Sequence, residues 1–241
     1  MSIDLENIKA DLLSGRPILV YDFDNRERET DIVFYAPKVT YKSVEFMRKY
    51  GGGLICVALG PEVWEKLGLP YLSDILKSLE EYLVIKRAAS IRIPYDEQSS
   101  FSITVNHKDT FTGISDRDRA LTISELGKLA EISFRISEGD LKELFANNFR
   151  TPGHVHILNA RKGLLDKRHG HTELVIGLSK LLGIAPAMAI VEMLGDTGLS
   201  LKKEAAKEFA REFDLIFIEG KEILEVWRLE KEKESSGLRD V

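Results

Sequence analysis

The sequence predicts an α/β fold in which helices cover both faces of a mixed β-sheet. Strand and helix patterns alternate along most of the chain, which is typical of α/β domains. Residues 187–191 form a continuous apolar run, as in a strand buried on both faces, whereas residues 101–106 alternate apolar and polar side chains as a half-exposed strand does. The chain has 241 residues, 44% of them hydrophobic, so it can bury a substantial core. No linker divides it, and we expect one domain over residues 1–228 followed by a charged, flexible tail over residues 229–241.

The elements follow from hydrophobic periodicity and from capping residues. Ser2 can cap a first helix that places Leu5, Ile8 and Leu12 on one face and ends at residues 15–17. We expect strands at residues 18–21, 32–35, 54–58, 101–106, 154–158, 187–194 and 215–218. We expect further helices at residues 41–50, 61–67, 72–82, 116–130, 173–182, 202–213 and 221–228, with Gly51-Gly-Gly53 as a helix stop and Ser115 as a cap.

Residues 22–31, between the first two predicted strands, contain five acidic residues and two arginines. Strands on both sides hold this segment as a loop, so its carboxylates converge at one end of the sheet and can hold a hard cation. Taken by itself, the segment is explained equally well as a solvent-exposed connecting loop without a function.

Four of the five histidines lie in the segments Pro152-Gly-His-Val-His156 and Lys167-Arg-His-Gly-His-Thr172. One or two of them could reach a metal ion, although half-buried histidines with satisfied hydrogen bonds are commoner. The second segment precedes a predicted helix, and the amides at the helix start, with Arg168 and the Thr172 hydroxyl, suit a phosphate.

Two further features carry polar groups to the ends of predicted elements. Thr112-Gly-Ile-Ser115 stands at a helix start and is a second candidate phosphate contact, although taken by itself an ordinary capped turn explains it better. Glu192 ends an apolar run, so its carboxylate either faces a cavity, where it suits acid–base chemistry, or takes an exposed edge position.

The composition argues against several classes of protein. A net charge of -5 and a pI near 5.7 disfavour broad contact with nucleic acid. Nothing resembles a signal peptide, and no apolar run reaches the roughly 18 residues that span a bilayer, so we expect a soluble cytoplasmic protein. Cys56 is the single cysteine, which excludes an intrachain disulfide; it suits a buried thiol, and a position near the site stays open.

Five motifs stand in a fixed order: residues 22–31, Thr112-Gly-Ile-Ser115, Pro152-Gly-His-Val155, Arg168-His-Gly-His-Thr172, and Glu-x-x-x-Asp-x-Gly at residues 192–198. Together they resemble the 3,4-dihydroxy-2-butanone 4-phosphate synthase family of riboflavin biosynthesis, in its monofunctional, archaeal-like form without a fused GTP cyclohydrolase II domain. The resemblance covers nearly the whole chain. It implies a three-layer α/β/α sandwich and a homodimer with sites near the subunit interface. It also implies a carbon–carbon lyase that converts D-ribulose 5-phosphate into L-3,4-dihydroxy-2-butanone 4-phosphate and formate with Mg²⁺ or Mn²⁺.

The resemblance further implies roles for individual residues. Glu27 and His171 match metal ligands, with Glu29 as an additional contact. His154 and Glu192 match positions essential for catalysis. The positions expected to bind substrate are Arg26, Glu27, Asp31, Thr112, Arg168, His169, Gly170, His171, Thr172 and Glu192.

Three residues depart from the family pattern. Thr30 stands where many members have glycine, Arg28 replaces a common asparagine, and His169 fills the free position of the phosphate-binding turn. We expect these changes to affect loop conformation rather than activity. Two other functions would use the same residues: a different metal-dependent sugar-phosphate isomerase or aldolase, and a non-catalytic module that binds a metabolite.

Overall fold

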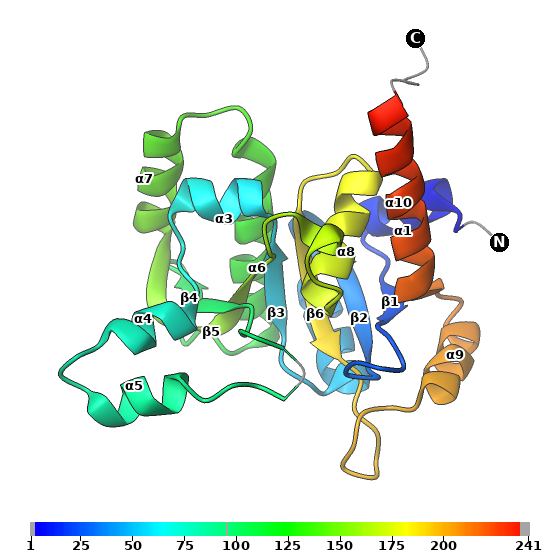
Figure 1. Cartoon of the computed structure of the whole chain (residues 1–241), viewed down its shortest axis with the longest axis horizontal. Coiled ribbons are helices and arrows are strands. Elements are labelled where there is room, and N and C mark those ends of the chain that lie inside the picture. Colours follow the sequence, from blue (N-terminus) through cyan, green and yellow to red (C-terminus); the bar gives the residue numbers. More distant parts are fainter. Residues whose placement is uncertain (1–2, 95, 237–241) are drawn as a thin grey trace.

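A seven-stranded mixed sheet forms the centre of the protein, in the order β4-β5-β3-β6-β2-β1-β7 (Figure 1). The computed structural model describes residues 3–94 and 96–236. The strands are β1 Ile18–Tyr21, β2 Thr30–Tyr35, β3 Cys56–Leu59, β4 Phe101–His107, β5 Phe149–Asn159, β6 Ala187–Glu192 and β7 Phe217–Glu219. The pairs β1·β7 and β3·β5 are parallel and the other neighbours are antiparallel. The mixed sheet that the sequence predicts is therefore confirmed.

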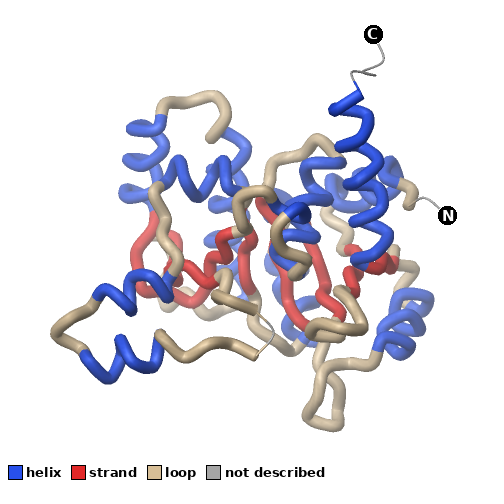
Figure 2. The backbone as a smooth tube through the Cα atoms, viewed as in Figure 1, coloured by secondary structure: helices blue, strands red, loops and turns tan. Residues whose placement is uncertain are grey.

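Helices pack on both faces of this sheet, which makes a three-layer α/β/α sandwich (Figure 2). One face carries α1 Leu5–Ser14, α8 His171–Leu181 and α10 Gly220–Ser236. The other carries α2 Tyr41–Phe46, α3 Pro61–Leu67, α6 Asp116–Ile132, α7 Glu138–Asn148 and α9 Lys203–Glu212. Side chains alternate between the two cores along each strand: Leu19 enters one core, and Ile18 and Val20 enter the other. All four residues of β1 are buried because both faces are covered.

Local capping chemistry sets several of the boundaries. The side chain of Asp4 accepts a hydrogen bond from the Asn7 amide at 3.1 Å and caps α1, whereas the predicted cap Ser2 lies outside the described residues. Ser115 caps α6 as predicted, through a 3.1 Å bond from the Asp118 amide. The glycine run stops the second helix: after α2 the chain makes a π-helical turn, Met47–Gly51, and Gly52 then takes the left-handed conformation.

Two helices were not predicted. The helix expected at residues 72–82 is shorter in the structure, α4 Leu72–Ser78, and the unpredicted helix α5 Leu83–Ala89 follows it; no residue of either helix is buried. Helix α7 buries Leu141 alone among its residues. Helices that bury so little apolar surface carry a weak periodic signal, which explains why the sequence pattern does not reveal them.

The predicted alternation along β4 is also wrong in part. Phe101 is 37% exposed and Ser102 is buried, although Phe101 was expected on the inner face. The pairing of β4 with β5 is irregular between Phe101 and Thr104, and such a bulge changes the face on which the following side chains lie.

The last helix of the described part is longer than predicted. Helix α10 continues past Arg228 to Ser236, supported by ion pairs on its exposed face such as Lys233–Glu230 at 2.7 Å. Residues 237–241 lie outside the described part, so the mobility expected for residues 229–241 stays a prediction, as does the boundary at residue 228. None of the helices within residues 3–94 and 96–236 is long and apolar enough to cross a membrane.

Candidate active site

Most of the predicted site residues lie at one end of the sheet, where several strands begin or end. Strand β1 ends there before the acidic loop, β2 begins there with Thr30 and Asp31, β6 ends there with Glu192, and α8 begins there with His171. A pocket of about 350 Å³ opens at this end of the sheet. It is lined by Arg26, Glu27, Glu29, Asp31, Cys56, Ile93, Ser99, Ser100, Phe101, Leu158, Arg168, His171, Thr172, Ile190 and Glu192. The tertiary fold thus unites motifs that lie up to 166 residues apart, from Arg26 to Glu192.

Asp22 closes the acidic loop. Its side chain is 1% exposed and accepts the backbone amides of Glu27 at 2.9 Å and Glu29 at 3.0 Å. Thr30 pairs with Tyr21 as ordinary β-strand, so its side chain needs no left-handed backbone. The left-handed residue of the loop is Arg28, with φ of 62°. Asparagine tolerates this conformation better than arginine, which fits the asparagine common at this position in the family.

His171 is the central group of the acidic pocket. Its ring is 6% exposed; Nδ1 donates to Glu27 Oε2 at 3.2 Å and Nε2 donates to the Glu29 carbonyl at 3.2 Å. Burial alone would lower the pKa of His171, but nearby carboxylates, those of Asp31 and Glu27 foremost, outweigh burial and raise it to about 10. The imidazole therefore holds a proton that a metal ion would have to replace.

Three donor groups in this part of the pocket are close enough to share a cation. Ligand atoms of Asp22, Glu27 and His171 all lie within 4.8 Å of one another. Two carboxylates and one imidazole suit Mg²⁺ or Mn²⁺, which prefer oxygen and accept nitrogen. Two of these residues, Glu27 and His171, are the ligands expected from the sequence. Asp22 was expected mainly to shape the loop, and its bonds to the loop amides agree with that, although its position also puts it in the donor group.

A pair of carboxylates faces the same pocket. Asp31 on β2 and Glu192 on β6 are direct cross-strand partners. Burial raises the pKa of Asp31, to about 8, and the neighbouring Glu192 adds to the effect. Asp31 Oδ1 is buried and accepts no hydrogen bond from any described residue, although His171 Nε2 lies 3.6 Å away. Glu192 is held by the Leu54 amide at 2.8 Å. A buried acceptor without a donor is costly in a folded protein, which indicates that a ligand or proton completes this site.

The Arg168–Thr172 segment forms the turn into α8. Gly170 is the N-cap of the helix, and a Cβ at this position would lie 2.3 Å from Arg168 Nη1 and 2.9 Å from Arg26 Nη2. A side chain at this position would therefore have to displace one or both guanidinium groups. Arg168 and Thr172 line the pocket, whereas His169 turns away and its Nε2 bonds to the Leu165 carbonyl at 3.0 Å.

The two remaining predicted site residues form a second cluster. Asn106 Nδ2 lies 3.1 Å from His154 Nδ1 and 3.5 Å from the Thr112 carbonyl, and Asn106 Oδ1 accepts the His154 amide at 2.8 Å. His154 and Thr112 are exposed, and neither is among the described residues that line the acidic pocket. The phenyl ring of Phe111, beside this cluster, is 93% exposed, and Ile114 is 52% exposed.

Several residues in or beside the pocket had no predicted role in the site. Cys56 is buried and also lines the pocket, so the core position and the position near the site are both correct. Ser99 and Ser100 line the pocket just before β4. Asp96, from the same loop, bonds to Arg26 and Arg168. This loop shows neither a periodic pattern nor a charge cluster in the sequence. Its place in the site is therefore visible only in the structure, where the loop lies beside the pocket and the two arginines.

Comparisons with known proteins identify the family. Residues 6–226 match the family model for 3,4-dihydroxy-2-butanone 4-phosphate synthase. The synthase of that name from Methanosarcina acetivorans is 47% identical over 226 residues, covering 90% of this chain and 88% of the relative. The one from Archaeoglobus fulgidus is 46% identical over 239 residues, covering 98% and 99%.

Solved structures agree with the fold. The crystal structure of the Candida albicans synthase is 28% identical, with a TM-score of 0.70 over 94% of this chain and 98% of that one. A synthase structure in complex with two magnesium ions is 24% identical, with a TM-score of 0.69 over 92% and 94% of the two chains, and at this identity it supports the fold alone.

These similarities define an α/β lyase. The chain belongs to the 3,4-dihydroxy-2-butanone 4-phosphate synthase family. The predicted family, enzyme class and place in riboflavin biosynthesis are confirmed.

Proposed function

We propose that this protein converts D-ribulose 5-phosphate into L-3,4-dihydroxy-2-butanone 4-phosphate and formate. The observation that carries the proposal is the meeting of Glu27, Asp31, His171 and Glu192 in one pocket, with Arg168 beside the start of α8. Proton-transfer groups and a cation site lie at one end, and a phosphate site at the other. This arrangement suits repeated proton transfers on a sugar phosphate whose phosphate is held away from the reacting carbons.

Glu27 and His171 are the proposed metal ligands, with Glu29 as a further contact. Ligand atoms of Glu27, His171 and Asp22 lie within 4.8 Å of one another, which supports the first two ligands. Glu29 lies outside this group, and its role rests on the family resemblance. Mg²⁺ or Mn²⁺, when bound, would stabilise negative charge on the carbonyl and hydroxyl oxygens of the substrate. Glu29 is held in place by the Ser200 hydroxyl, which donates to its Oε1.

His154 and Glu192 are the proposed proton carriers, and Asp31 assists them. The reaction begins with removal of a proton beside the ketone and later needs protons for loss of the C1 hydroxyl, the skeletal shift and release of C4 as formate. The raised pKa of Asp31, about 8, allows this carboxyl group to hold or release a proton near neutral pH. Its direct neighbour Glu192 lies on the same face of the sheet, where the two can act on adjacent atoms of one substrate.

Arg26, Arg168 and Thr172 are the proposed phosphate contacts. Both arginine side chains are largely buried, with 11% and 12% of their surface exposed, so they act in a medium in which ionic hydrogen bonds are strong. The amides at the start of α8 add donors of fixed direction. His169 and Gly170 are proposed to contribute to the substrate site by shaping this turn.

The active unit is proposed to be a homodimer with its sites near the subunit interface. Thr112 and His154 lie outside the acidic pocket of their own chain, on an exposed surface that also carries Phe111 and Ile114. Exposed apolar side chains next to proposed catalytic groups suit a surface that a second copy covers. In such a dimer, Thr112 and His154 of one subunit complete the pocket of the other. A cytoplasmic location stays a prediction from the sequence.

The direct test is to incubate the purified protein with ribulose 5-phosphate and Mg²⁺ and to measure formate and the four-carbon phosphate. Formate and the four-carbon product in equal amounts would support the proposal. A five-carbon sugar phosphate as the product would instead identify an isomerase, and binding without turnover would identify a metabolite-binding module. An excess of chelator should abolish turnover, and added Mg²⁺ should restore it; full activity in chelator would contradict the metal assignment.

A further inference from the structure

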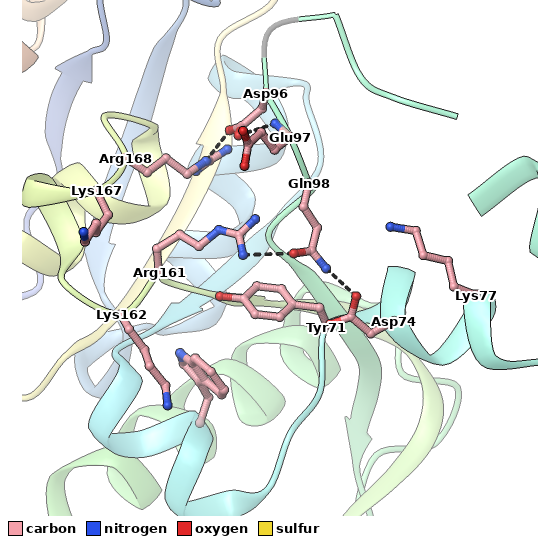
Figure 3. A pocket seen from close by; sticks show the side chains of 11 residues that line it. Tyr71, Asp74, Lys77, Asp96, Glu97, Gln98, Arg161, Lys162, Lys167 and Arg168 are labelled. Atoms are coloured by element: carbon pink, nitrogen blue, oxygen red, sulfur yellow. Dashed lines mark hydrogen bonds and ion pairs between the residues drawn. The ribbon is translucent and has the colours of Figure 1, made fainter. Parts of the chain in front are cut away.

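A carboxylate from a neighbouring loop occupies the space between the two proposed phosphate-binding arginines. Asp96 Oδ2 accepts a hydrogen bond from Arg26 Nη2 at 3.1 Å and also one from Arg168 Nε (Figure 3 shows the contact with Arg168). A single oxygen thus bridges two guanidinium groups that come from the acidic loop and from the turn before α8. A phosphate oxygen would make the same contacts.

Arg168 has a second acidic partner besides Asp96. Its Nη1 donates to Glu173 Oε2; Glu173 is fully buried on α8, and its Oε1 also accepts the Arg161 amide at 2.9 Å. Glu173 therefore fixes the orientation of Arg168 whether or not Asp96 is present. Arg26 likewise keeps Glu27 at 2.8 Å as a partner. Neither arginine depends on Asp96 to remain ion-paired.

Asp96 lies on the side of Arg168 that faces a second, larger cavity. This cavity of about 790 Å³ is lined by five basic residues (Lys77, Arg161, Lys162, Lys167 and Arg168) and three acidic ones (Asp74, Asp96 and Glu97) (Figure 3). Arg168 lines both cavities, so a carboxylate that leaves it has room on the basic side. Contact with Arg168 and Arg26 outweighs burial and holds the pKa of Asp96 below its usual value, so Asp96 is an anion at neutral pH.

We propose that Asp96 is an internal competitor of the substrate phosphate: its carboxylate binds Arg26 and Arg168 in the free enzyme and must leave them when a phosphate binds. The inference rests on the proposed function, because it takes these arginines as the phosphate site. It assigns to Asp96 a part in setting the affinity for the phosphate end of the substrate. A ligand that displaces a bound anion loses the free energy of the displaced contacts, so removal of the competing charge tightens binding.

The test compares Asp96→Asn with Glu97→Gln. Both changes remove one negative charge from the same loop and the same cavity. Glu97, however, is exposed, and within the described residues its side chain forms no hydrogen bond or ion pair with either arginine. Inorganic phosphate is the first probe, titrated into each protein by calorimetry. We expect Asp96→Asn to bind phosphate at least on the order of tenfold more tightly than wild type, because the two ionic hydrogen bonds of the Asp96 carboxylate no longer have to be broken. Glu97→Gln should stay within about twofold of wild type.

Steady-state kinetics with ribulose 5-phosphate give the second readout. KM should fall in Asp96→Asn with little change in kcat, because Asp96 is displaced in both the substrate complex and the transition state. Asp96→Ala, which also removes the acceptor oxygen, should change KM in the same direction and covers the case in which Asp96→Asn folds poorly. An unchanged or weakened phosphate affinity in both Asp96 variants would overturn the proposal and make Asp96 a positioning residue. If wild type releases no formate, the proposed function fails, but the phosphate titration still decides the role of Asp96.

Discussion

Glu27 joins the two ends of the acidic pocket through its two carboxylate oxygens. One oxygen lies 2.8 Å from Arg26 Nη1 and the other lies 3.2 Å from His171 Nδ1. Although burial opposes it, the hydrogen bond and charge of His171 and the charge of Arg26 keep the pKa of Glu27 below its usual value. Glu27 is thus an anion at neutral pH, as a metal ligand must be.

Glu27→Gln should abolish nearly all formate release, a loss on the order of 100-fold or more, because a neutral amide is a poor ligand for a hard cation. The measurement is formate release at saturating Mg²⁺, with Mg²⁺ binding followed by calorimetry. Asp24→Asn is the matched control, since Asp24 belongs to the same loop, its side chain is 81% exposed and it does not line the pocket. Near-normal turnover by folded Glu27→Gln would remove Glu27 from the metal site.

At the scale of elements, Glu219 fastens the edge strand β7 to the helices beside it. Its carboxylate pairs with Lys203 at 2.9 Å and Lys207 at 3.0 Å, both on α9, and with Lys221 on α10 at 2.9 Å. Burial opposes the shift, but the three lysines outweigh it and lower the pKa of Glu219 from 4.5 to about 2. Because the pKa is lower in the folded state, these pairs stabilise the protein above about pH 4.5, and the stabilisation is lost as the pH falls toward 2.

Glu219→Gln should therefore lower the free energy of unfolding at pH 7 by about 1 kcal/mol, with no difference from wild type near pH 2. Urea unfolding at several pH values between these limits measures the effect. Glu212→Gln on the exposed end of α9 is the control and should leave the pH dependence unchanged. A constant difference between Glu219→Gln and wild type at every pH would show that the lysine pairs are not its cause.

The sequence predicts elements well where one face is strongly apolar and poorly where it is not. The bounds of β1, Ile18–Tyr21, agree with the prediction, since four consecutive buried residues between loop signals leave little choice. The α6 start agrees because Ser115 is a strong cap. Helices α5 and α7 were missed because they bury one residue or none, and β5 was placed too short because its first half, residues 149–153, pairs irregularly with β4.

At the scale of the whole molecule, the proposed site divides into two clusters that one chain does not bring into contact. The acidic pocket holds Glu27, His171 and Glu192, whereas His154 bonds to Asn106 on the exposed surface. A two-fold dimer can place the second cluster of one subunit over the pocket of the other. Such a dimer would allow a variant altered in one cluster to complement a variant altered in the other.

Glu27→Gln and His154→Ala should each be inactive alone but recover activity when mixed and allowed to exchange subunits. In a mixed dimer, one site combines an intact pocket with an intact His154, so about a quarter of all sites become active at equal amounts. Formate release after denaturation and joint refolding measures the recovery. The control mixes Glu27→Gln with Glu192→Gln, which alter the same pocket and should not complement. Absence of recovery in exchanged dimers would place His154 in the site of its own chain, two strands away from Glu192 across β3.

The fold class, the family and most of the residues of the acidic pocket can be predicted from the amino-acid sequence. Motifs of charged residues and glycine next to strand and helix ends are local, and their order along the chain is enough to identify them. Which of these residues share a cavity depends on how the chain folds in three dimensions. Cross-strand pairing puts Asp31 against Glu192, the turn before α8 brings His171 to Glu27, and His154 lies in a separate cluster. Asp96 belongs to none of the motifs, and it contacts two arginines because loops that are distant in the sequence meet at one end of the sheet. Such contacts depend on strand order and loop packing, which the local sequence pattern does not encode.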